Sequence, residues 1–193
     1  MSKEIPDYID EIFGIEAKGM FSDIATAPNI FTEIISLNKT QCENAVSYIK
    51  SILTECYLSG GVKVVAFKPE NEIYGYGILF DLPKSESASY LHKIFVHQKY
   101  RRKGLGAHIL QTFIDSERPV VLICPHDKIK FYEKSGFYYQ HKFVVPGNGN
   151  FVLSNGLHSD LVVMSTEQGI TEAPVFLLND TDLNIIAGRQ SKI

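Results

Sequence analysis

Apolar and polar positions in the first third of the chain follow patterns that predict two helices and a strand. The clearest helix covers residues 40–57, because its apolar side chains recur every three or four residues. Thr40 and Glu43 have the spacing of a capping box that would begin this helix, and two glycines follow its end. A shorter helix is expected over residues 6–14, and residues 30–37 are expected to form a strand.

The middle of the chain predicts three strands, a helix and a buried strand, in that order. Residues 62–67 and 73–80 are rich in β-branched and aromatic residues, and the polar turn between them is typical of a hairpin. Residues 88–96 predict a third strand. Helical spacing over residues 104–117 and an unbroken apolar run over residues 120–124 predict the last two elements.

The last third predicts a helix, two strands and a C-terminal hairpin. Asp127 is expected to cap a helix through residue 134, and residues 137–145 and 161–165 are expected to be strands. Two apolar runs, residues 174–178 and 183–186, flank a polar turn in the manner of a hairpin. Because an uncovered apolar hairpin would aggregate, we expect it to extend the sheet, to close an acceptor cleft or to contact a second subunit.

The composition is that of a globular protein, and it excludes several classes of function. The chain has 193 residues, of which 45% are apolar and 21% charged, so it is long enough to bury a core. A formal net charge of −3 provides no basic field for DNA, RNA or an anionic membrane, and it suits a cationic partner better. The three cysteines, Cys42, Cys56 and Cys124, show neither a disulfide framework nor metal-ligand spacing, so no metal site is expected. With no apolar leader and no run of membrane-spanning length, a cytoplasmic location is expected.

The most informative segment is the basic, glycine-containing stretch from Arg101 to Ala107, which lies between a predicted strand and a predicted helix. Unpaired N–H groups at a helix start, the helix dipole and the lack of a Cβ on glycine all favour a bound phosphate. Ile109 stands where a dinucleotide-binding fingerprint needs its third glycine, and the Lys-Ser/Thr pair of a Walker loop is absent. The alternative interpretation is that Gly104 and Gly106 only shape a tight turn.

Arg101-x-x-Gly104-x-Gly106 after a strand resembles the acetyl-CoA signature of the GNAT superfamily of N-acyltransferases. The segment 131–137, Phe-Tyr-Glu-Lys-Ser-Gly-Phe, is similar to a second motif of that superfamily and lies at the expected distance. The resemblance covers residues 30–165 and divides the chain into an N-terminal extension (1–30), an acetyltransferase domain (31–166) and a C-terminal extension (167–193).

The resemblance implies an α+β fold with a mixed, mostly antiparallel sheet flanked by helices. Two parallel strands of this sheet would splay apart and admit the pantetheine arm of acetyl-CoA, which is the implied co-substrate. Backbone groups of Ile94, Phe95 and Val96 would bind the arm. The diphosphate would be held by the amides of the loop: Arg102, Lys103, Gly104, Leu105, Gly106 and Ala107. Arg101 and Lys134 would reach the cofactor, or Arg101 would cap nearby carbonyls and Lys134 would lie in solvent.

Acetyl transfer to an amine needs a base, a donor to the thioester carbonyl and an acid for the leaving thiolate. Tyr132 occupies the position of the family's general acid, and the alternative is a buried aromatic residue. His92 is the candidate base because the strand 91–101 resembles that of serotonin N-acetyltransferase, although Tyr90 stands where that enzyme has a second histidine. An ordered water without a dedicated base is the alternative. The Val96 N–H is the candidate donor to the carbonyl.

The acceptor is expected to be a small cationic amine, because the chain is acidic. A lysine or N-terminal amine of a protein is an alternative acceptor, and a noncatalytic module that binds acyl-CoA is an alternative function. The variable segments that would bind the acceptor are the first helix, the turn at residues 83–87 and the turn at residues 147–156. A second copy of the chain is a further candidate partner.

Overall fold

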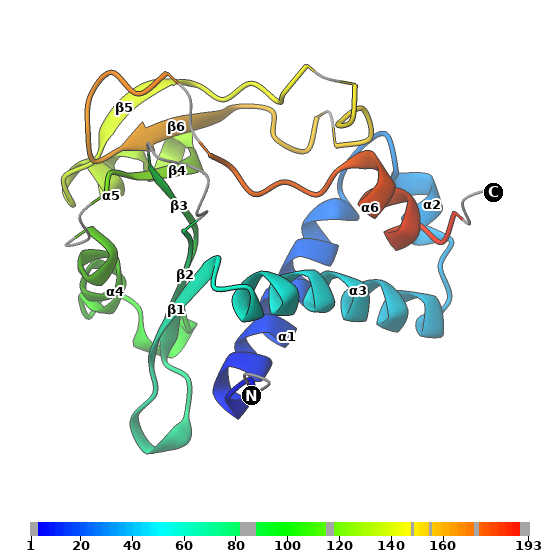
Figure 1. Cartoon of the computed structure of the whole chain (residues 1–193), viewed down its shortest axis with the longest axis horizontal. Coiled ribbons are helices and arrows are strands. Elements are labelled where there is room, and N and C mark those ends of the chain that lie inside the picture. The colour runs from blue at the N-terminus through cyan, green and yellow to red at the C-terminus, as the bar shows by residue number, and fades with distance from the viewer. Residues whose placement is uncertain are drawn as a thin grey trace. The chain divides into compact units, whose positions relative to one another are not determined.

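The computed structural model describes residues 4–81, 88–114, 118–147, 149–154, 156–171 and 174–189. The expected turn at residues 83–87 and the end of the predicted helix at residues 115–117 therefore lie outside the described residues. Internal contacts group the chain into two units, whose elements are labelled in Figure 1. The sheet unit comprises residues 57–143 and 160–176, and the helical unit comprises residues 1–56, 144–159 and 177–193.

The sheet unit is built on six strands in the order β1-β2-β3-β4-β6-β5. All neighbouring strands are antiparallel except β3 and β4, which are parallel. This confirms the mixed, mostly antiparallel sheet that the sequence resemblance implied. The strands are β1 (Val62–Phe67), β2 (Gly75–Phe80), β3 (Ser89–Val96), β4 (Val120–Pro125), β5 (Tyr138–Lys142) and β6 (Leu161–Ser165).

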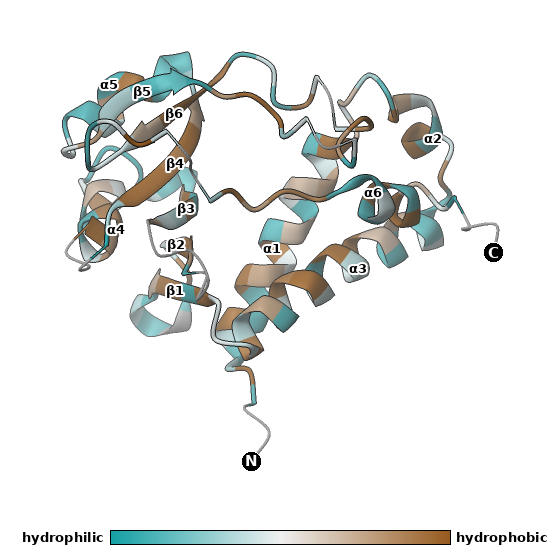
Figure 2. Cartoon of the chain, turned by 45° about the horizontal axis from the view of Figure 1, so that its top comes forward, coloured by the Kyte–Doolittle hydropathy of each residue, from teal (hydrophilic) through white to brown (hydrophobic). Residues whose placement is uncertain are grey.

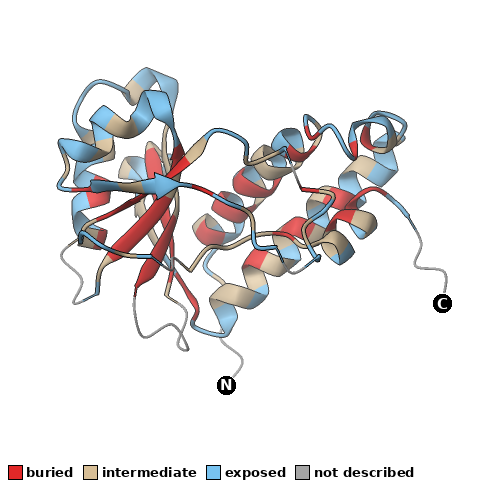
Figure 3. Cartoon of the chain, turned by 90° about the horizontal axis from the view of Figure 1, so that it is seen from above, coloured by how far each residue is buried: buried red, intermediate tan, exposed pale blue. Residues whose placement is uncertain are grey.

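Burial follows the position of each strand in the sheet. β2 and most of β4 are buried along their length, whereas the edge strand β5 is largely exposed. In Figure 3, buried residues of the sheet are red and exposed residues are pale blue. Figure 2 shows the same contrast in hydropathy, with β4 and β6 brown and β5 teal to white. The predicted hairpin of β1 and β2 is confirmed, with Val62 opposite Phe80.

Two α-helices accompany the sheet, α4 (Leu105–Ile114) and α5 (Ile129–Glu133). Ile109, Leu110 and Phe113 of α4 are buried in the core, as their helical spacing predicts. The prediction that Asp127 caps α5 is wrong. Asp127 lies in a 3-10 turn before the helix, and its carboxylate pairs with Lys128.

The helical unit contains α1 (Asp7–Ile24), α2 (Phe31–Ile35), α3 (Lys39–Leu58) and α6 (Asp180–Ile186). The first helix does not end at Gly14, because its buried apolar face continues to Ala17 and Ile24. The strand predicted over residues 30–37 is wrong. Ile30 and Ile34 are buried one helical turn apart while Phe31 and Ile35 are exposed, so the segment forms a helix.

The sequence located α3 correctly but not the residues that cap it. The Gln41 N–H donates to Asn38 Oδ1 at 3.0 Å, and the Asn38 N–H donates to Gln41 Oε1 at 2.9 Å. This reciprocal pair is a capping box two residues before the predicted Thr40 and Glu43. Gly60, with φ of +82°, follows the end of the helix as expected.

The predicted C-terminal hairpin is also wrong, because residues 183–186 belong to α6. Asn179 Oδ1 accepts from the N–H groups of Thr181 and Asp182, and the Asp182 carboxylate accepts from the Asn179 N–H. This capping box starts a helix whose buried face holds Leu183 and Ile186, which are spaced for a helix. The division of the chain at residues 30 and 166 stays a prediction.

Candidate active site

Strands β3 and β4 separate soon after they begin. Their parallel pairing joins Ser89 to Val120 and Tyr90 to Val121, and no later pair joins them within the described residues. Beyond these pairs, β3 keeps β2 as its neighbour and β4 keeps β6. We call the opening between the later parts of β3 and β4 the splay. The strand edges on either side of it hold backbone groups that have no opposing strand.

A β-bulge in β3 sets which backbone groups face the splay. Ile78 pairs with Lys93 and Leu79 pairs with Leu91, so His92 is the extra residue on its strand. Successive residues of a strand direct their N–H and C=O groups to opposite sides, and a bulge of this kind shifts that alternation by one residue. The residues of β3 after His92 therefore direct their backbone groups to the two sides of the strand in a different register from the residues before it.

That alternation is fixed by the hydrogen bond from the His97 N–H to the Tyr74 carbonyl, at 2.9 Å. In an antiparallel ladder, successive residues point their N–H and C=O groups to opposite sides. The groups of Phe95 therefore face β2, and those of Ile94 and Val96 face the splay. Of the three residues expected to bind an extended arm through the backbone, Ile94 and Val96 have the required orientation and Phe95 does not.

The loop before α4 carries a row of backbone N–H groups without an internal acceptor. The first hydrogen bond of the helix joins the His108 N–H to the Gly104 carbonyl at 3.0 Å. In the described part of the chain, the N–H groups of residues 102–107, which we call the amide row, donate to no acceptor. Such a row at a helix N-terminus favours an anionic ligand.

The glycines of the amide row differ in their surroundings. Gly104 has a φ of +80°, and no atom lies within 4 Å of the position where a Cβ would be. Arg102 also has a left-handed backbone, with a φ of +62°. A Cβ at Gly106 would lie 3.7 Å from the side chains of Phe131 and Val96, so an alanine would fit there. Gly104 therefore leaves room for a ligand, whereas Gly106 lies against the strand that borders the splay.

The basic side chains near the amide row are engaged to different degrees. Arg101 Nε donates to the Val96 carbonyl at 2.9 Å, so the guanidinium caps the end of β3. This favours the capping role that the sequence left open for Arg101. The Lys103 ammonium lies 5.9 Å from the centre of the Tyr100 ring. Lys134, at the end of α5, is exposed.

Tyr132 extends from α5 onto the core of the sheet unit. Its ring makes edge-to-face contacts with Phe131 and Phe137, at centroid distances of 5.0 and 5.7 Å. Burial, with a smaller contribution from the Cys124 thiol, raises the pKa of Tyr132 to about 12. Among the described residues, no group forms a hydrogen bond with its hydroxyl. The phenol is therefore protonated throughout the neutral range and is available as a donor.

His92 lies in an aromatic cluster at the bulge of β3. Its ring makes edge-to-face contacts with Phe80 and Phe176, both at 5.6 Å, and these two rings stack on each other at 4.4 Å. Tyr90 is a more distant neighbour, with a centroid separation of 6.1 Å. Both ring nitrogens of His92 are buried. The structure thus encloses the candidate base in apolar side chains.

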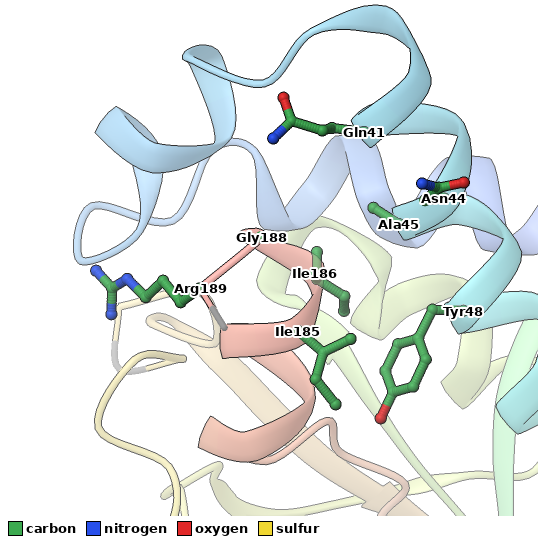
Figure 4. A pocket seen from close by; sticks show the side chains of 8 residues that line it. All are labelled: Gln41, Asn44, Ala45, Tyr48, Ile185, Ile186, Gly188 and Arg189. Carbon is green, nitrogen blue, oxygen red and sulfur yellow. The ribbon is translucent and has the colours of Figure 1, made fainter. Parts of the chain in front are cut away.

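Each unit contains a pocket. The pocket of the sheet unit has a volume of about 580 Å³ and is lined by Phe67, Tyr74, Tyr100, Lys103, Gly104 and His108. It adjoins the amide row. Figure 4 shows the pocket of the helical unit, which lies between α3 side chains such as Tyr48 and the end of α6. None of the predicted site residues lines this second pocket.

The described residues carry neither a membrane-spanning helix nor a cluster of metal ligands. No described helix combines the length and the hydrophobicity that crossing a bilayer requires. Likewise, no three His, Cys, Asp or Glu side chains of the described residues gather as metal ligands would.

The comparison with known families finds one match, in the sheet unit. Residues 60–139, which include the splay, the amide row and Tyr132, match the sequence model of the acetyltransferase (GNAT) domain. This segment is therefore similar to a GNAT domain. A search of curated proteins gave no match.

Several solved structures are similar to this chain. The N-acetyltransferase of Staphylococcus aureus Mu50 matches over 81% of this chain and 96% of that one, with 14% identity and a TM-score of 0.54. A GNAT family acetyltransferase of Elizabethkingia anophelis with acetyl-CoA bound matches over 60% and 82%, with 21% identity and a TM-score of 0.44. A chimeric spermidine N-acetyltransferase of Vibrio cholerae matches over 62% and 75%, with 14% identity and a TM-score of 0.47.

Sequence reasoning missed two features of the sheet unit. Phe176, from the segment after β6, covers His92, and no local pattern connects these distant residues. Gly75 and Gly77 of β2 allow the sheet to approach α4, since a Cβ at Gly77 would lie 2.9 Å from Ile109. The two glycines, spaced by two residues in a predicted strand, were the signal for this close approach.

Proposed function

We propose that this protein is an N-acetyltransferase of the GNAT type that transfers the acetyl group of acetyl-CoA to a small cationic primary amine. The amide row beside the splay is the observation that carries the proposal, because the six N–H groups lack an internal acceptor in the described residues. The family of the domain supplies the reaction class.

The residues at the splay fit an acyl-CoA. The amide row and the open space at Gly104 suit a diphosphate, since backbone N–H groups at a helix start are good donors to it. The N–H and C=O groups of Ile94 suit an amide of pantetheine, which would bind as an added strand, and the Val96 N–H is left for the thioester carbonyl. When bound there, the thioester supplies the acetyl group.

The chain would assist the transfer at three atoms. The amine nitrogen forms a bond with the acetyl carbon as the bond to sulfur breaks, and the Val96 N–H stabilises negative charge on the carbonyl oxygen. The Tyr132 hydroxyl donates its proton to the leaving sulfur. The amine loses a proton to His92, or to a water molecule in its place, because an alkylamine is mostly protonated at neutral pH.

The burial of His92 affects which group can accept the proton of the amine. Its nitrogens are buried, and its ring lies against the stacked pair of Phe80 and Phe176, so a proton would leave the ring through a neighbouring group or after Phe176 moves. This supports water as the immediate acceptor of the proton, with His92 behind it. A protein amine as acceptor, a noncatalytic acyl-CoA-binding role and a second copy of the chain as partner stay predictions.

Calorimetry with acetyl-CoA, followed by a thiol-release assay on a panel of amines, tests the proposal. The panel holds polyamines, arylalkylamines, amino acids and peptides with a free lysine or N-terminus. We expect acetyl-CoA to bind and at least one small cationic amine to be acetylated. Binding without turnover on any amine would support the noncatalytic module, and turnover only on peptides would make the acceptor a protein. Absence of binding would reject the proposal as a whole.

A further inference from the structure

The candidate base His92 lies where its own strand does not fix the direction of the side chain. Its neighbours Leu91 and Lys93 pair with residues of β2, and His92 is the extra residue of the bulge between them. In a regular strand, side chains alternate between the two faces of the sheet, whereas a bulge re-aims the side chain of the extra residue. The direction of the imidazole therefore depends on the groups that pack around it.

Two phenylalanine rings pack against this imidazole. Phe80 of β2 and Phe176, which follows β6, stack at a centroid distance of 4.4 Å, with their planes 13° apart. The His92 ring lies 5.6 Å from each of them and almost perpendicular to both, at 86° and 84°. Such edge-to-face contacts favour particular relative orientations of the rings. A rotation of the imidazole would therefore weaken its contacts with both rings at once.

The two phenylalanines are held in place by different means. Phe80 is 1% exposed and lies on β2, which has a strand on either side. Phe176 lies outside the helices and strands, and in the described part of the chain no hydrogen bond joins residues 174–176 to another residue. Side-chain packing therefore holds Phe176. A substitution there changes the contact with His92 and leaves the described backbone hydrogen bonds in place.

The aromatic contacts also shield the atoms that would accept a proton. Both ring nitrogens of His92 are buried. A proton acceptor contributes to a reaction when it lies within hydrogen-bond reach of the donor or of one bridging water molecule. Misplacement by about 1 Å can lower a rate by about 100-fold. An imidazole that rotates, or that bulk water surrounds, would therefore be a poorer acceptor than one held in place.

We propose that Phe176 is a positioning residue for the transfer, which holds the imidazole of His92 against Phe80 in the orientation from which the ring receives the amine proton. The inference rests on the proposed function, since it takes His92 to receive that proton through a water molecule. Phe176 touches neither the substrates nor the reacting atoms, and its effect passes through His92. The segment after β6 thereby supports a site whose proposed acid and base lie on α5 and β3.

Kinetics of the full chain with the best amine of the panel test the positioning role. Phe176→Leu keeps an apolar side chain but removes the flat ring, and we expect kcat to fall about tenfold with the Kd of acetyl-CoA unchanged. Phe176→Tyr retains the ring and should keep kcat close to wild type. Phe143→Leu makes the same chemical change at a buried phenylalanine outside this cluster, and as the matched control it should leave kcat unchanged.

Two further measurements show whether Phe176 acts through His92. In a His92→Gln background, Phe176→Leu should lower kcat no further, because the group that it positions is already absent. Carbethoxylation by diethyl pyrocarbonate, followed by peptide mass spectrometry, reports access to the His92 nitrogens without any turnover. We expect this modification to be slow in wild type and in Phe143→Leu, and several-fold faster in Phe176→Ala.

The outcomes separate the positioning role from the proposed function. If wild type is active and Phe176→Leu has the same kcat, or lowers kcat equally in the His92→Gln background, the positioning role is overturned and the proposed function stands. The same holds if His92→Gln keeps the wild-type kcat, or if His92 is modified equally fast in wild type and in Phe176→Ala. If wild type acetylates no amine, the proposed function and this inference both fail.

Discussion

At the scale of single residues, the site depends on groups whose ordinary behaviour is changed by their surroundings. Tyr132 keeps its proton to an unusually high pH because burial disfavours the phenolate, and the neighbouring Cys124 thiol adds to this effect. Burial also raises the pKa of Cys124, to about 11, so its thiol is protonated at neutral pH. The thiolate that a covalent acyl-enzyme would need is therefore scarce, which favours direct attack by the amine.

Tyr132→Phe removes the proposed acid and little else. We expect kcat to fall about 100-fold, the lower range for loss of a general acid, with the Kd of acetyl-CoA within twofold of wild type. Steady-state kinetics and calorimetry on the same preparations measure the two quantities. Tyr138→Phe, at an exposed tyrosine of β5, is the control and should change neither. Wild-type turnover by Tyr132→Phe would exclude the acid role.

The raised pKa of Tyr132 also predicts how stability depends on pH. A pKa near 12 in the folded state, against about 10 in the unfolded chain, means that folding favours the protonated phenol. This stabilisation is complete below about pH 10 and is lost as the pH rises toward 12. Urea unfolding at pH 9, 10.5 and 11.5 should therefore show a steeper loss of stability for wild type than for Tyr132→Phe. Parallel losses in the two proteins would contradict the assignment.

Gly104 offers the sharpest test of the amide row. Gly104→Glu places a carboxylate and a side chain at a left-handed residue where the ligand needs open space, so binding of acetyl-CoA should fall below detection in calorimetry. Gly106→Ala is the matched control, because its new Cβ would meet neighbours at an ordinary 3.7 Å. Undiminished affinity in Gly104→Glu would mean that the diphosphate does not lie on this loop.

At the scale of secondary-structure elements, the site exists because β3 ends its pairing with β4 while α4 stays close to the sheet. The two strands share only the pairs at Ser89 and Tyr90, which opens the splay. Glycines 75 and 77 on β2 allow α4 to pack against the sheet and so fix the position of its N-terminus. The bulge at His92 then orients the backbone N–H and C=O groups of Ile94 and Val96 toward the splay.

Gly77→Ala should disturb this packing of α4 on β2. The added methyl would overlap the Phe113 ring and lie 2.9 Å from Ile109, so we expect a loss of about 1–3 kcal/mol in the free energy of unfolding. We also expect weaker binding of acetyl-CoA, because the start of α4 would shift. Gly19→Ala in α1, where no atom lies within 4 Å of the new Cβ, is the control and should gain up to about 1 kcal/mol. Unchanged stability in Gly77→Ala would contradict this account of the close approach.

At the scale of the whole molecule, the chain builds two units from interleaved segments. Every residue proposed to bind coenzyme A or to transfer the acetyl group lies in the sheet unit. The helical unit gathers three stretches of the sequence and contains its own polar contact, the hydrogen bond from the Tyr48 hydroxyl to Asp182 at 2.8 Å. Burial and this carboxylate raise the pKa of Tyr48 to about 12.

This division predicts that damage to the helical unit spares coenzyme binding. Leu183→Ala removes a fully buried side chain of α6 and should cost about 2–4 kcal/mol of stability, while the Kd of acetyl-CoA stays within twofold of wild type. Ile185→Ala, at an exposed position of the same helix, should change stability little. Chemical unfolding and calorimetry measure both effects. A tenfold loss of coenzyme affinity in Leu183→Ala would show that the helical unit takes part in coenzyme binding.

The sequence alone determined the features that repeat locally. The helical spacing of α3 and α4, the β-rich runs of β1 to β4 and the glycine-containing loop at residues 101–107 each carry their signal within a few residues. The predictions from sequence were wrong where two local patterns favour different secondary structures. At residues 30–37 and 183–186, β-branched residues predicted strands, but spacing suited to a helix and, at Asn179, a capping box favoured helices.

Only the tertiary structure decided which backbone and side-chain groups meet. The separation of β3 from β4, the burial of His92 under Phe176 and the proximity of Phe67 to the amide row all join residues far apart in the chain. Such contacts depend on strand register and packing, which no short stretch of sequence encodes by itself. The loop sequence therefore identified where a phosphate could bind, and the fold determined what lies on either side of it.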